Sequence, residues 1–186
     1  MPDRNKMASI LICIAIGLAY VNTLSAEPVF DDLPILRAVE RHSHESICIW
    51  LRSLIKWRGA DRPLLFLSYR LDHRIFGQKL TGWHWTNIVI HATNSLLIYA
   101  ILLHFYSTQG ALLGSLVFAV HPLATSGVSC IAGRSSSLSA IFYFAAILAA
   151  VSGHWLLTIP LGWLSWKCKE DAVLLPAALL GLWLVT

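Results

Sequence analysis

Charge is the scarcest feature of this sequence. Only 13% of its 186 residues are charged, against roughly 25% in an ordinary soluble domain, and Arg134 is the only charged residue between Lys79 and Lys167. Hydrophobic residues make up 56% of the chain and include eight tryptophans, a residue enriched at membrane–water boundaries. The net charge of +4 is modest, which argues against nucleic acid and favours membrane lipids as partners. The composition predicts an all-α integral membrane protein.

Familiar catalytic and metal-binding motifs are also missing. The chain has no glycine-rich phosphate loop, no Ser-His-Asp or HExxH pattern, no internal repeat and no low-complexity tract. The four cysteines have no CxxC or zinc-ligand spacing, and we interpret them as unpaired packing residues; the sequence does not establish a Cys48–Cys130 disulfide. Any chemistry must therefore come from scattered polar residues beside hydrophobic segments.

The chain divides into three expected parts. Residues 1–26 form a first transmembrane helix, a signal anchor, because Arg4 and Lys6 precede a long apolar run. Leu24-Ser25-Ala26 also fits a signal-peptide cleavage site, which is the alternative. Residues 27–83 form a long outer loop with amphipathic interfacial helices, and residues 84–186 form a transmembrane bundle. We expect about five or six transmembrane helices in all.

Two sequence signals predict opposite membrane orientations. The first apolar run predicts a cytoplasmic amino terminus and a first loop on the non-cytoplasmic side, in a plasma or inner membrane or the endoplasmic reticulum. However, residues 27–83 carry nine Lys and Arg residues, against two in the amino terminus, and a simple count would put the loop in the cytoplasm. The charge rule weakens for loops near 60 residues, so we keep the first orientation.

The outer loop contains two candidate features. Asp31 and Asp32 form a carboxylate pair that suits a divalent metal or a general base; alternatively, Asp32 is the N-cap of a helix with Pro34 in its first turn. Residues 45–57, ESICIWLRSLIKW, have apolar residues at helical spacing and predict an amphipathic helix in the membrane interface. His42 and His44 could be ligands, but histidines in a polar loop are more often solvated side chains.

The bundle begins with an expected span from Trp83 to Tyr106. Asn87, His91 and Asn94 recur at i, i+4 and i+7, and this polar stripe should face other helices or a polar cavity rather than lipid. We favour hydrogen bonds between helices over a binding role. A third span covers residues 111–120. Residues 138–151 and 155–166 are apolar but together number about thirty, where two full spans need roughly forty.

The region from 138 to 166 has two possible paths. Two short helices joined at Gly153 would return Lys169 and Glu170 to the side of Asp31, whereas one crossing would place them in the cytoplasm. The segment before it, residues 118–138, contains His121-Pro122, which ends the third span, and the isolated Arg134. An ionisable residue alone between two spans indicates a functional site, and the alternative is an arginine that snorkels to lipid headgroups.

Five stretches in this order resemble one family: FDD, RPLLFLSYRL, WHWTNIVIHATNSLL, FAVHPLATSGVSCIAGRSSSL and CKEDAVLLP. Together they resemble the amino-terminal half of the GT-C membrane glycosyltransferases, especially the transmembrane-and-TPR proteins related to protein O-mannosyltransferases. The resemblance covers roughly residues 30–176. It implies transfer of a sugar from a polyprenyl-phosphate carrier, at the outer membrane face, to a protein, lipid or glycan acceptor.

The resemblance also implies roles for individual residues. Asp31 or Asp32 would be the catalytic carboxylate, and Arg134 and Lys169 would contact the carrier phosphate. The remaining expected substrate-binding residues are Arg62, Arg70, His121 and Glu170. No metal ligands are assigned, and a divalent metal stays open as a cofactor.

The chain departs from the family pattern in two ways. Ser126 and Ser136 stand where the family often has acidic residues, which removes expected polar contacts. Complete GT-C enzymes have about twice as many spans, so this chain is expected to be a fragment, a split enzyme or a shortened relative. The alternative function is a non-catalytic membrane subunit that packs against another subunit in a larger complex.

Overall fold

A computed structural model describes residues 2–42 and 62–185 of the chain. The expected interfacial helix at 45–57, together with His44 and Cys48, lies outside the described residues. Within them every regular element is a helix. The main helices are α1 (Pro2–Tyr20), α2 (Asp32–Arg41), α4 (Pro63–Phe76), α5 (Leu80–Leu102), α6 (Thr108–Val120), α7 (Thr125–Ser129), α8 (Arg134–Val151), α9 (Thr158–Cys168) and α10 (Leu175–Val185).

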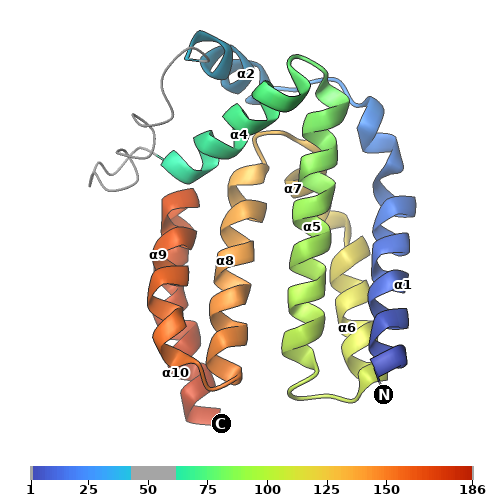
Figure 1. Cartoon of the computed structure of the whole chain (residues 1–186), viewed down its shortest axis with the longest axis vertical. Coiled ribbons are helices and arrows are strands. Elements are labelled where there is room, and N and C mark those ends of the chain that lie inside the picture. The colour runs from blue at the N-terminus through green and yellow to red at the C-terminus, as the bar shows by residue number, and fades with distance from the viewer. Residues whose placement is uncertain (1, 43–61, 186) are drawn as a thin grey trace.

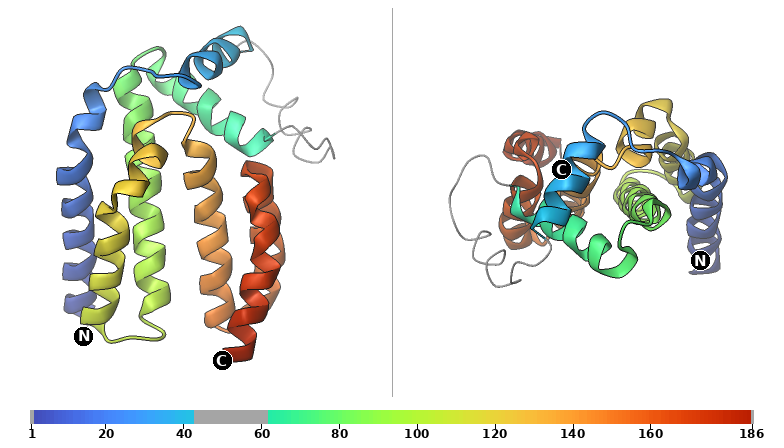
Figure 2. Two further views of the ribbon diagram at one scale, coloured as in Figure 1. Left: turned by 180° about the vertical axis from the view of Figure 1, so that it is seen from behind. Right: turned by 90° about the horizontal axis from the view of Figure 1, so that it is seen from above.

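Two sets of helices differ in direction. Helices α1, α5, α6, α8, α9 and α10 run along the long axis of the molecule, whereas α2 and α4 lie across one end of the bundle (Figures 1 and 2). The amino terminus and the α5–α6 and α8–α9 turns lie at the opposite end (Figure 1). The described connections at the end that α2 and α4 cover contain Asp31, Arg62 and Glu170.

The segment from 134 to 168 forms a helical hairpin. Helix α8 ends at Val151, Gly153 adopts a φ of +83° in the turn, and a short 3-10 helix (Trp155–Leu157) leads into α9. Glycine reaches this left-handed region without the clash that a Cβ would cause. The two-helix path is therefore the one observed, and it returns Lys169 to the end of the bundle that holds α2.

Three helices are long and apolar enough to cross a membrane: residues 4–25, 80–102 and 134–151. A fourth crossing results if α6 and the segment 122–129, which meet at a 50° bend, count as one span. Helices α9 and α10 have 11 residues each and would cover only about 16 Å, against roughly 30 Å of hydrocarbon. The described part is thus all-helical, with three or four candidate spans by length and composition; the expected number of about five or six stays a prediction.

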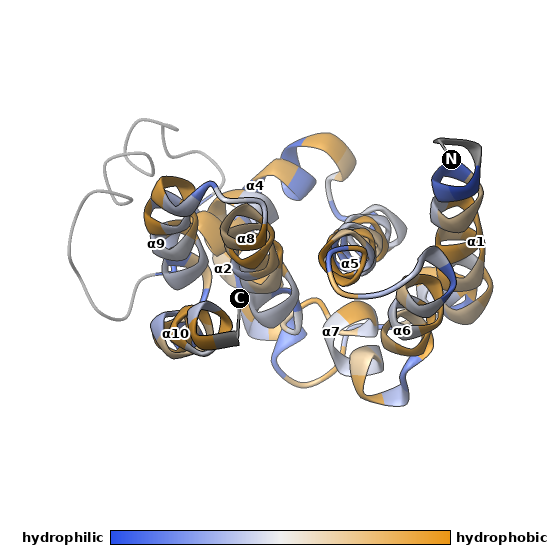
Figure 3. Ribbon diagram, turned by 90° about the horizontal axis from the view of Figure 1, so that it is seen from below, coloured by the Kyte–Doolittle hydropathy of each residue, from blue (hydrophilic) through white to orange (hydrophobic). Residues whose placement is uncertain are grey.

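Two hydrophobic clusters hold the bundle together. In the first, α1 buries Ala8, Ile12, Ile16 and Tyr20 against α5 and α6, and this spacing of four residues places them on one helix face. The second cluster joins α2, α4 and α5 to the loop before α8 through Val39, Leu65, Tyr69, Trp83 and Ile131. Hydrophobic residues also cover outward faces of the helices (Figure 3), as expected of surfaces that meet lipid.

Candidate functional site

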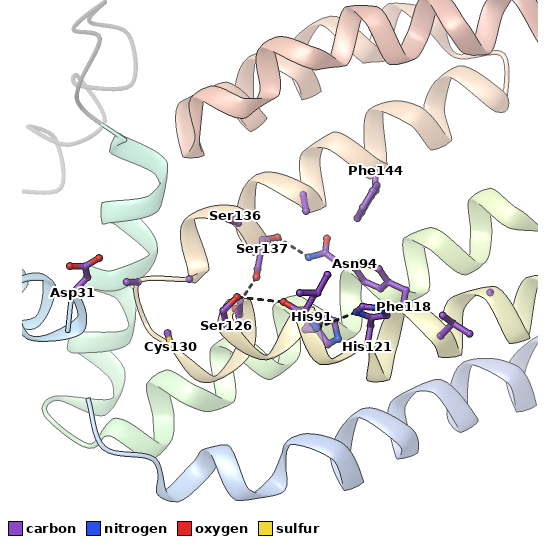
Figure 4. Close-up of a pocket in the computed structure, with 18 residues that line it drawn as sticks. Asp31, His91, Asn94, Phe118, His121, Ser126, Cys130, Ser136, Ser137 and Phe144 are labelled. Atoms are coloured by element: carbon purple, nitrogen blue, oxygen red, sulfur yellow. Dashed lines mark hydrogen bonds between the residues drawn. The ribbon is translucent and has the colours of Figure 1, made fainter. Parts of the chain in front are cut away.

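A groove of about 850 Å³ lies between α8 on one side and α6 and α7 on the other. Asp31 lies at one end of it and Phe144 toward the other, with several serines between them (Figure 4). The floor includes His91 and Asn94 of α5. The groove therefore joins a carboxylate to an aromatic stretch within one cavity. Its further lining residues are Gly114, Val117, Phe118, His121, Leu123, Ala124, Ser126, Gly127, Cys130, Ala132, Gly133, Ser136, Ser137 and Ala140.

The two neighbouring aspartates have different environments. Asp31 is exposed and lines the groove. Asp32 is only 1% exposed, and its two oxygens accept backbone N–H groups, from Ala132 at 2.8 Å and from Val29 at 3.2 Å. The alternative that Asp32 is the N-cap of α2 is wrong: Asp32 is the first helical residue, Asp31 is the N-cap, and no side-chain capping bond forms. Of the two aspartates, only Asp31 lines the groove.

The turn before Asp31 has an unusual backbone. Phe30 has a φ of +44° and a side chain that is 93% exposed. This left-handed region is disfavoured for a residue with a Cβ, and such strain persists only where the surrounding contacts enforce it. The hydrogen bond from the Val29 N–H to Asp32 closes this turn. The local structure thus places Asp32 against the Val29 and Ala132 backbone and Asp31 in the lining of the groove.

The carboxylate pair does not form a metal site by itself. Among residues 2–42 and 62–185, no three His, Cys, Asp or Glu side chains gather to hold a metal ion. Cys130 lines the groove near Asp32, but burial, and secondarily the negative charge of Asp32, raises the pKa of its thiol. A protonated thiol is a poor metal ligand.

His121 lies at the bend between α6 and α7. Its Nδ1 accepts the N–H of Leu123 at 3.2 Å, so the neutral ring carries its proton on Nε2. Pro122 follows at once and ends α6, as the sequence predicts. Because His121 is exposed and lines the groove, it offers a hydrogen-bond donor there.

Lys169 reaches the rim of the groove from the α9 side. Its Nζ donates to the Ser136 hydroxyl at 2.9 Å and pairs with Asp171 at 2.6 Å. Ser136 itself lines the groove. Where the family pattern suggests an acidic residue, this chain therefore has a serine that contacts a cation. The structure brings Asp31 and His121 to one groove and places the Lys169 ammonium against Ser136 of its lining.

Four other expected substrate-binding residues, Arg62, Arg70, Glu170 and Arg134, do not line this groove. Arg62, just before α4, donates to both carboxylate oxygens of Glu170 at 2.7 and 3.0 Å. A hydrogen bond from the Glu170 backbone, followed by that from Arg62, holds the pKa of the Glu170 carboxyl below its usual range. Arg70 lies half-buried on α4. The Arg62–Glu170 pair links α4 to the segment after α9.

Arg134 is fully buried at the start of α8, among α4 and α5. It pairs with Asp72 of α4 at 2.6 Å and donates to the Asn87 amide oxygen at 2.6 Å and the Trp83 carbonyl at 2.9 Å. Its guanidinium also lies 4.8 Å from the centre of the Tyr69 ring. Arg134 therefore neither lines the groove nor snorkels to a lipid surface in this structure.

The polar stripe of α5 makes the predicted contacts between helices. Asn87 donates to the Val128 and Cys130 carbonyls, at 3.1 and 3.0 Å. His91 bonds the Ala119 carbonyl at 2.9 Å, and Asn94 donates to the Ser137 carbonyl at 2.8 Å. Sequence reasoning missed Asp72 as the partner of Arg134. The buried His91 and Asn94 also line the groove, in agreement with the expectation that the stripe faces other helices or a polar cavity. The only signal for Asp72 was a lone acid in a basic stretch.

Comparison with known proteins identifies relatives of this chain. It is 28% identical over 192 residues to the Mus musculus protein named "Protein O-mannosyl-transferase TMTC3", covering 93% of this chain and 21% of the relative. It is 29% identical over 192 residues to the Drosophila melanogaster "Protein O-mannosyl-transferase Tmtc1", covering 92% and 22%. With the Homo sapiens "Protein O-mannosyl-transferase TMTC2" it shares 31% identity over 166 residues, covering 78% and 19%.

These similarities confirm the resemblance drawn from the sequence motifs. The chain spans about a fifth of the length of the curated relatives it matches. No protein-family profile and no solved structure matches the chain.

Proposed function

We propose that this chain, a relative of proteins named protein O-mannosyl-transferase, binds a polyprenyl-phosphate sugar in its groove and takes part in transferring that sugar to an acceptor hydroxyl. One observation carries the proposal: a single groove joins the exposed carboxylate of Asp31 to an aromatic stretch, with the Lys169 ammonium at its rim. A sugar linked to a lipid phosphate needs these three kinds of contact. The relatives' printed names support mannose as the sugar.

Different side chains in and beside the groove suit different parts of the donor. Phe118 and Phe144 meet edge to face, with centroids 6.0 Å apart, and such rings suit the nonpolar face of a sugar. Lys169 and the His121 ring supply donors for the carrier phosphate, because charge-assisted hydrogen bonds to phosphate are strong. The hydrocarbon tail would leave the groove at its rim, where the bundle meets lipid.

Asp31 would act as the general base. Its carboxylate takes the proton of the acceptor hydroxyl while the hydroxyl oxygen forms a bond to the anomeric carbon of the sugar. The bond between that carbon and the phosphate oxygen breaks, and the phosphate leaves with the electron pair. Lys169 stabilises the charge that develops on the phosphate. The products are the glycosylated acceptor and the polyprenyl phosphate.

The other charged residues would position the groove. Arg134 and Asp72 fix the start of α8, and Arg62 and Glu170 fix the segment that carries Lys169. We place this end of the bundle on the non-cytoplasmic side, with the amino terminus in the cytoplasm. This orientation suits a carrier that presents its sugar at the outer face.

A transfer assay tests the proposal. Membranes containing the chain receive a polyprenyl-phosphate mannose with a labelled sugar and a serine- and threonine-rich peptide. Asp31→Asn should lower transfer by about 10²–10⁴-fold, the range for loss of a general base, and leave donor binding intact. Glu27→Gln, a neighbouring exposed carboxylate outside the groove lining, is the matched control.

Two results would overturn the proposal. If the parent chain fails to bind the donor, the groove has another ligand or none. If the parent transfers mannose and Asp31→Asn does so equally well, Asp31 is not the base. Failure of both binding and transfer would favour the alternative, a non-catalytic membrane subunit.

A further inference from the structure

The side-chain carbonyl of Asn94 is a buried acceptor without a partner. Asn94 is 2% exposed and lines the groove, and its Oδ1 has no hydrogen-bond partner among the described residues. Its orientation is not ambiguous, because the Ser137 carbonyl 2.8 Å away can only accept and must therefore face the amide nitrogen. Oδ1 is thus the free atom.

The polar groups next to Asn94 are already engaged. The Ser137 hydroxyl donates to the Gly127 carbonyl at 2.8 Å, and His91 Nε2 bonds the Ala119 carbonyl at 2.9 Å. The rest of this stretch is aromatic: the His91 and Phe118 rings lie 5.4 Å apart, and Figure 4 shows Asn94 between Ser137 and Phe144. This part of the groove combines one acceptor with apolar walls.

A ligand that covers Asn94 must supply a donor. An unpaired buried carbonyl is costly, and a ligand that displaces water from it without replacing the hydrogen bond loses affinity. Of the three parts of the proposed donor, the phosphate presents acceptors at neutral pH and the hydrocarbon tail presents neither donor nor acceptor. Only the sugar carries hydroxyl donors.

We propose that Asn94 Oδ1 accepts a hydrogen bond from a hydroxyl of the donor's sugar, so that Asn94 distinguishes the sugar-loaded carrier from the bare carrier. The inference rests on the proposed function, because it takes the lipid-linked sugar as the ligand. The sugar lies in the middle of the groove, between Asp31 and the aromatic residues. An acceptor peptide could supply the same hydroxyl chemistry, and the experiment separates these two sources.

The test uses the full chain in lipid nanodiscs and two probes: a polyprenyl-phosphate mannose and the same polyprenyl phosphate without the sugar. Asn94→Ala should weaken binding of the mannose-bearing probe about two- to tenfold, the effect of one net hydrogen bond, and leave binding of the sugar-free probe unchanged. Thr93→Ala is the matched control, since its hydroxyl bonds only the Val89 carbonyl of its own helix. Asn94→Ala strands no acceptor, because the Ser137 carbonyl lies within α8 and keeps its helical bond.

A deoxy-mannose series on the same carrier identifies the hydroxyl. The probe that lacks the contacted hydroxyl should bind the parent as weakly as the complete probe binds Asn94→Ala, and it should lose nothing further in that variant. This non-additivity would not arise if the variant only loosened the fold.

Each other outcome overturns a stated part. Equal weakening of both probes means that Asn94 acts on the carrier or on the fold. Unchanged donor binding with weaker binding of a serine peptide assigns the hydroxyl to the acceptor. If the parent binds the mannose probe and Asn94→Ala binds it equally well, this inference alone is refuted. If the parent binds neither probe, the proposed function is refuted as well.

Discussion

The carboxylate of Asp32 accepts a hydrogen bond from the backbone N–H of Ala132, one hundred residues further along the chain, at 2.8 Å. Ala132 belongs to the wall of the groove. The other oxygen of Asp32 holds the Val29 N–H, so this buried side chain ties the turn that presents Asp31 to the groove that Asp31 lines. The relationship gives the two neighbouring aspartates different environments: Asp32 is buried and hydrogen-bonded, and Asp31, the proposed base, is exposed.

Replacing Asp32 by Asn should therefore reduce stability. The amide offers one acceptor where the carboxylate offers two, and an N–H donor left unpaired in the interior costs about 1–3 kcal/mol. We expect a lower midpoint of thermal unfolding in detergent for Asp32→Asn and an unchanged midpoint for Asp31→Asn, whose side chain is exposed. Equal stability of the two variants would show that the Asp32–Ala132 bond does not hold the turn.

The sequence could not separate these two residues. A pair of adjacent carboxylates predicts metal binding or a base from local chemistry alone, and both interpretations treat Asp31 and Asp32 alike. The helix-cap interpretation did distinguish them, but it chose Asp32, whereas Asp31 is the N-cap position. What separates them is a contact with Ala132, which depends on how α2 packs over the loop before α8. Such a contact has no local periodicity from which to infer it.

Breaking the buried pair of Arg134 and Asp72 should destabilise the fold strongly. Removal of one partner leaves a buried charge unpaired, at a cost of about 3–5 kcal/mol, so we expect Asp72→Asn to lower the unfolding midpoint markedly. Arg134→Lys should also destabilise, because a single ammonium cannot reach Asp72, Asn87 and Trp83 as the guanidinium fork does. Thermal unfolding of purified variants measures both.

Arg74→Lys serves as the control for these variants, since Arg74 is an exposed arginine on the same helix as Asp72. If Arg134→Lys kept the stability of the parent and selectively weakened binding of polyprenyl phosphate, Arg134 would contact the carrier. The role that the family resemblance implies for Arg134 would then hold.

The sequence identified Arg134 as exceptional but did not show which residue it pairs with. Its isolation among apolar residues is a local property and is visible in the chain, whereas its partner lies on α4, which crosses the end of the bundle. By contrast, the Asn87–His91–Asn94 stripe was interpreted correctly as interhelical, because helical spacing alone places those side chains on one face. Local periodicity predicts which side chains share a helix face, whereas tertiary packing determines which residues that face contacts.

Gly133→Ala should disrupt the wall of the groove. A Cβ at Gly133 would overlap the Ser126 carbonyl oxygen and lie 2.9 Å from the Gly127 Cα, and backbone atoms cannot move aside as a flexible side chain can. We expect a large loss of stability together with loss of donor binding. Gly17→Ala is the matched control: a Cβ there meets nothing within 4 Å, and alanine in a helix should gain up to about 1 kcal/mol over glycine. Similar behaviour of the two variants would contradict the tight approach at Gly133.

The Arg62–Glu170 link should persist into mild acid. The folded pKa of Glu170 is lowered, first by its own backbone N–H and then by Arg62, so its stabilisation is present above the ordinary glutamate pKa of about 4.3 and is lost as the pH falls through the lowered value. The difference in unfolding midpoint between the parent and Glu170→Gln should therefore be the same at pH 7 and pH 5 and vanish only in stronger acid. A difference already lost at pH 5 would show that the pair is open in solution.

Labelling of single cysteines can test whether the site residues share one side of the membrane. The structure places Asp31, Ser136 and Lys169 around one groove, at the end of the bundle opposite the α5–α6 and α8–α9 turns (Figure 1). In a chain without its native cysteines, Asp31→Cys, Ser136→Cys and Lys169→Cys should react with a membrane-impermeant maleimide from the same side.

Ser107→Cys and Gly153→Cys, in the two opposite turns, should react only from the other side. If Lys169→Cys labelled together with Gly153→Cys, the α8–α9 hairpin would not cross the membrane, and Lys169 could not meet a phosphate beside Asp31. If the three site cysteines labelled together but from the cytoplasm, the residues would still share one groove, but the proposed outer-face orientation would be wrong. The nine basic residues between α1 and α5 would then lie in the cytoplasm, as the positive-inside rule predicts. The experiment thus separates the geometry of the site from its orientation in the membrane.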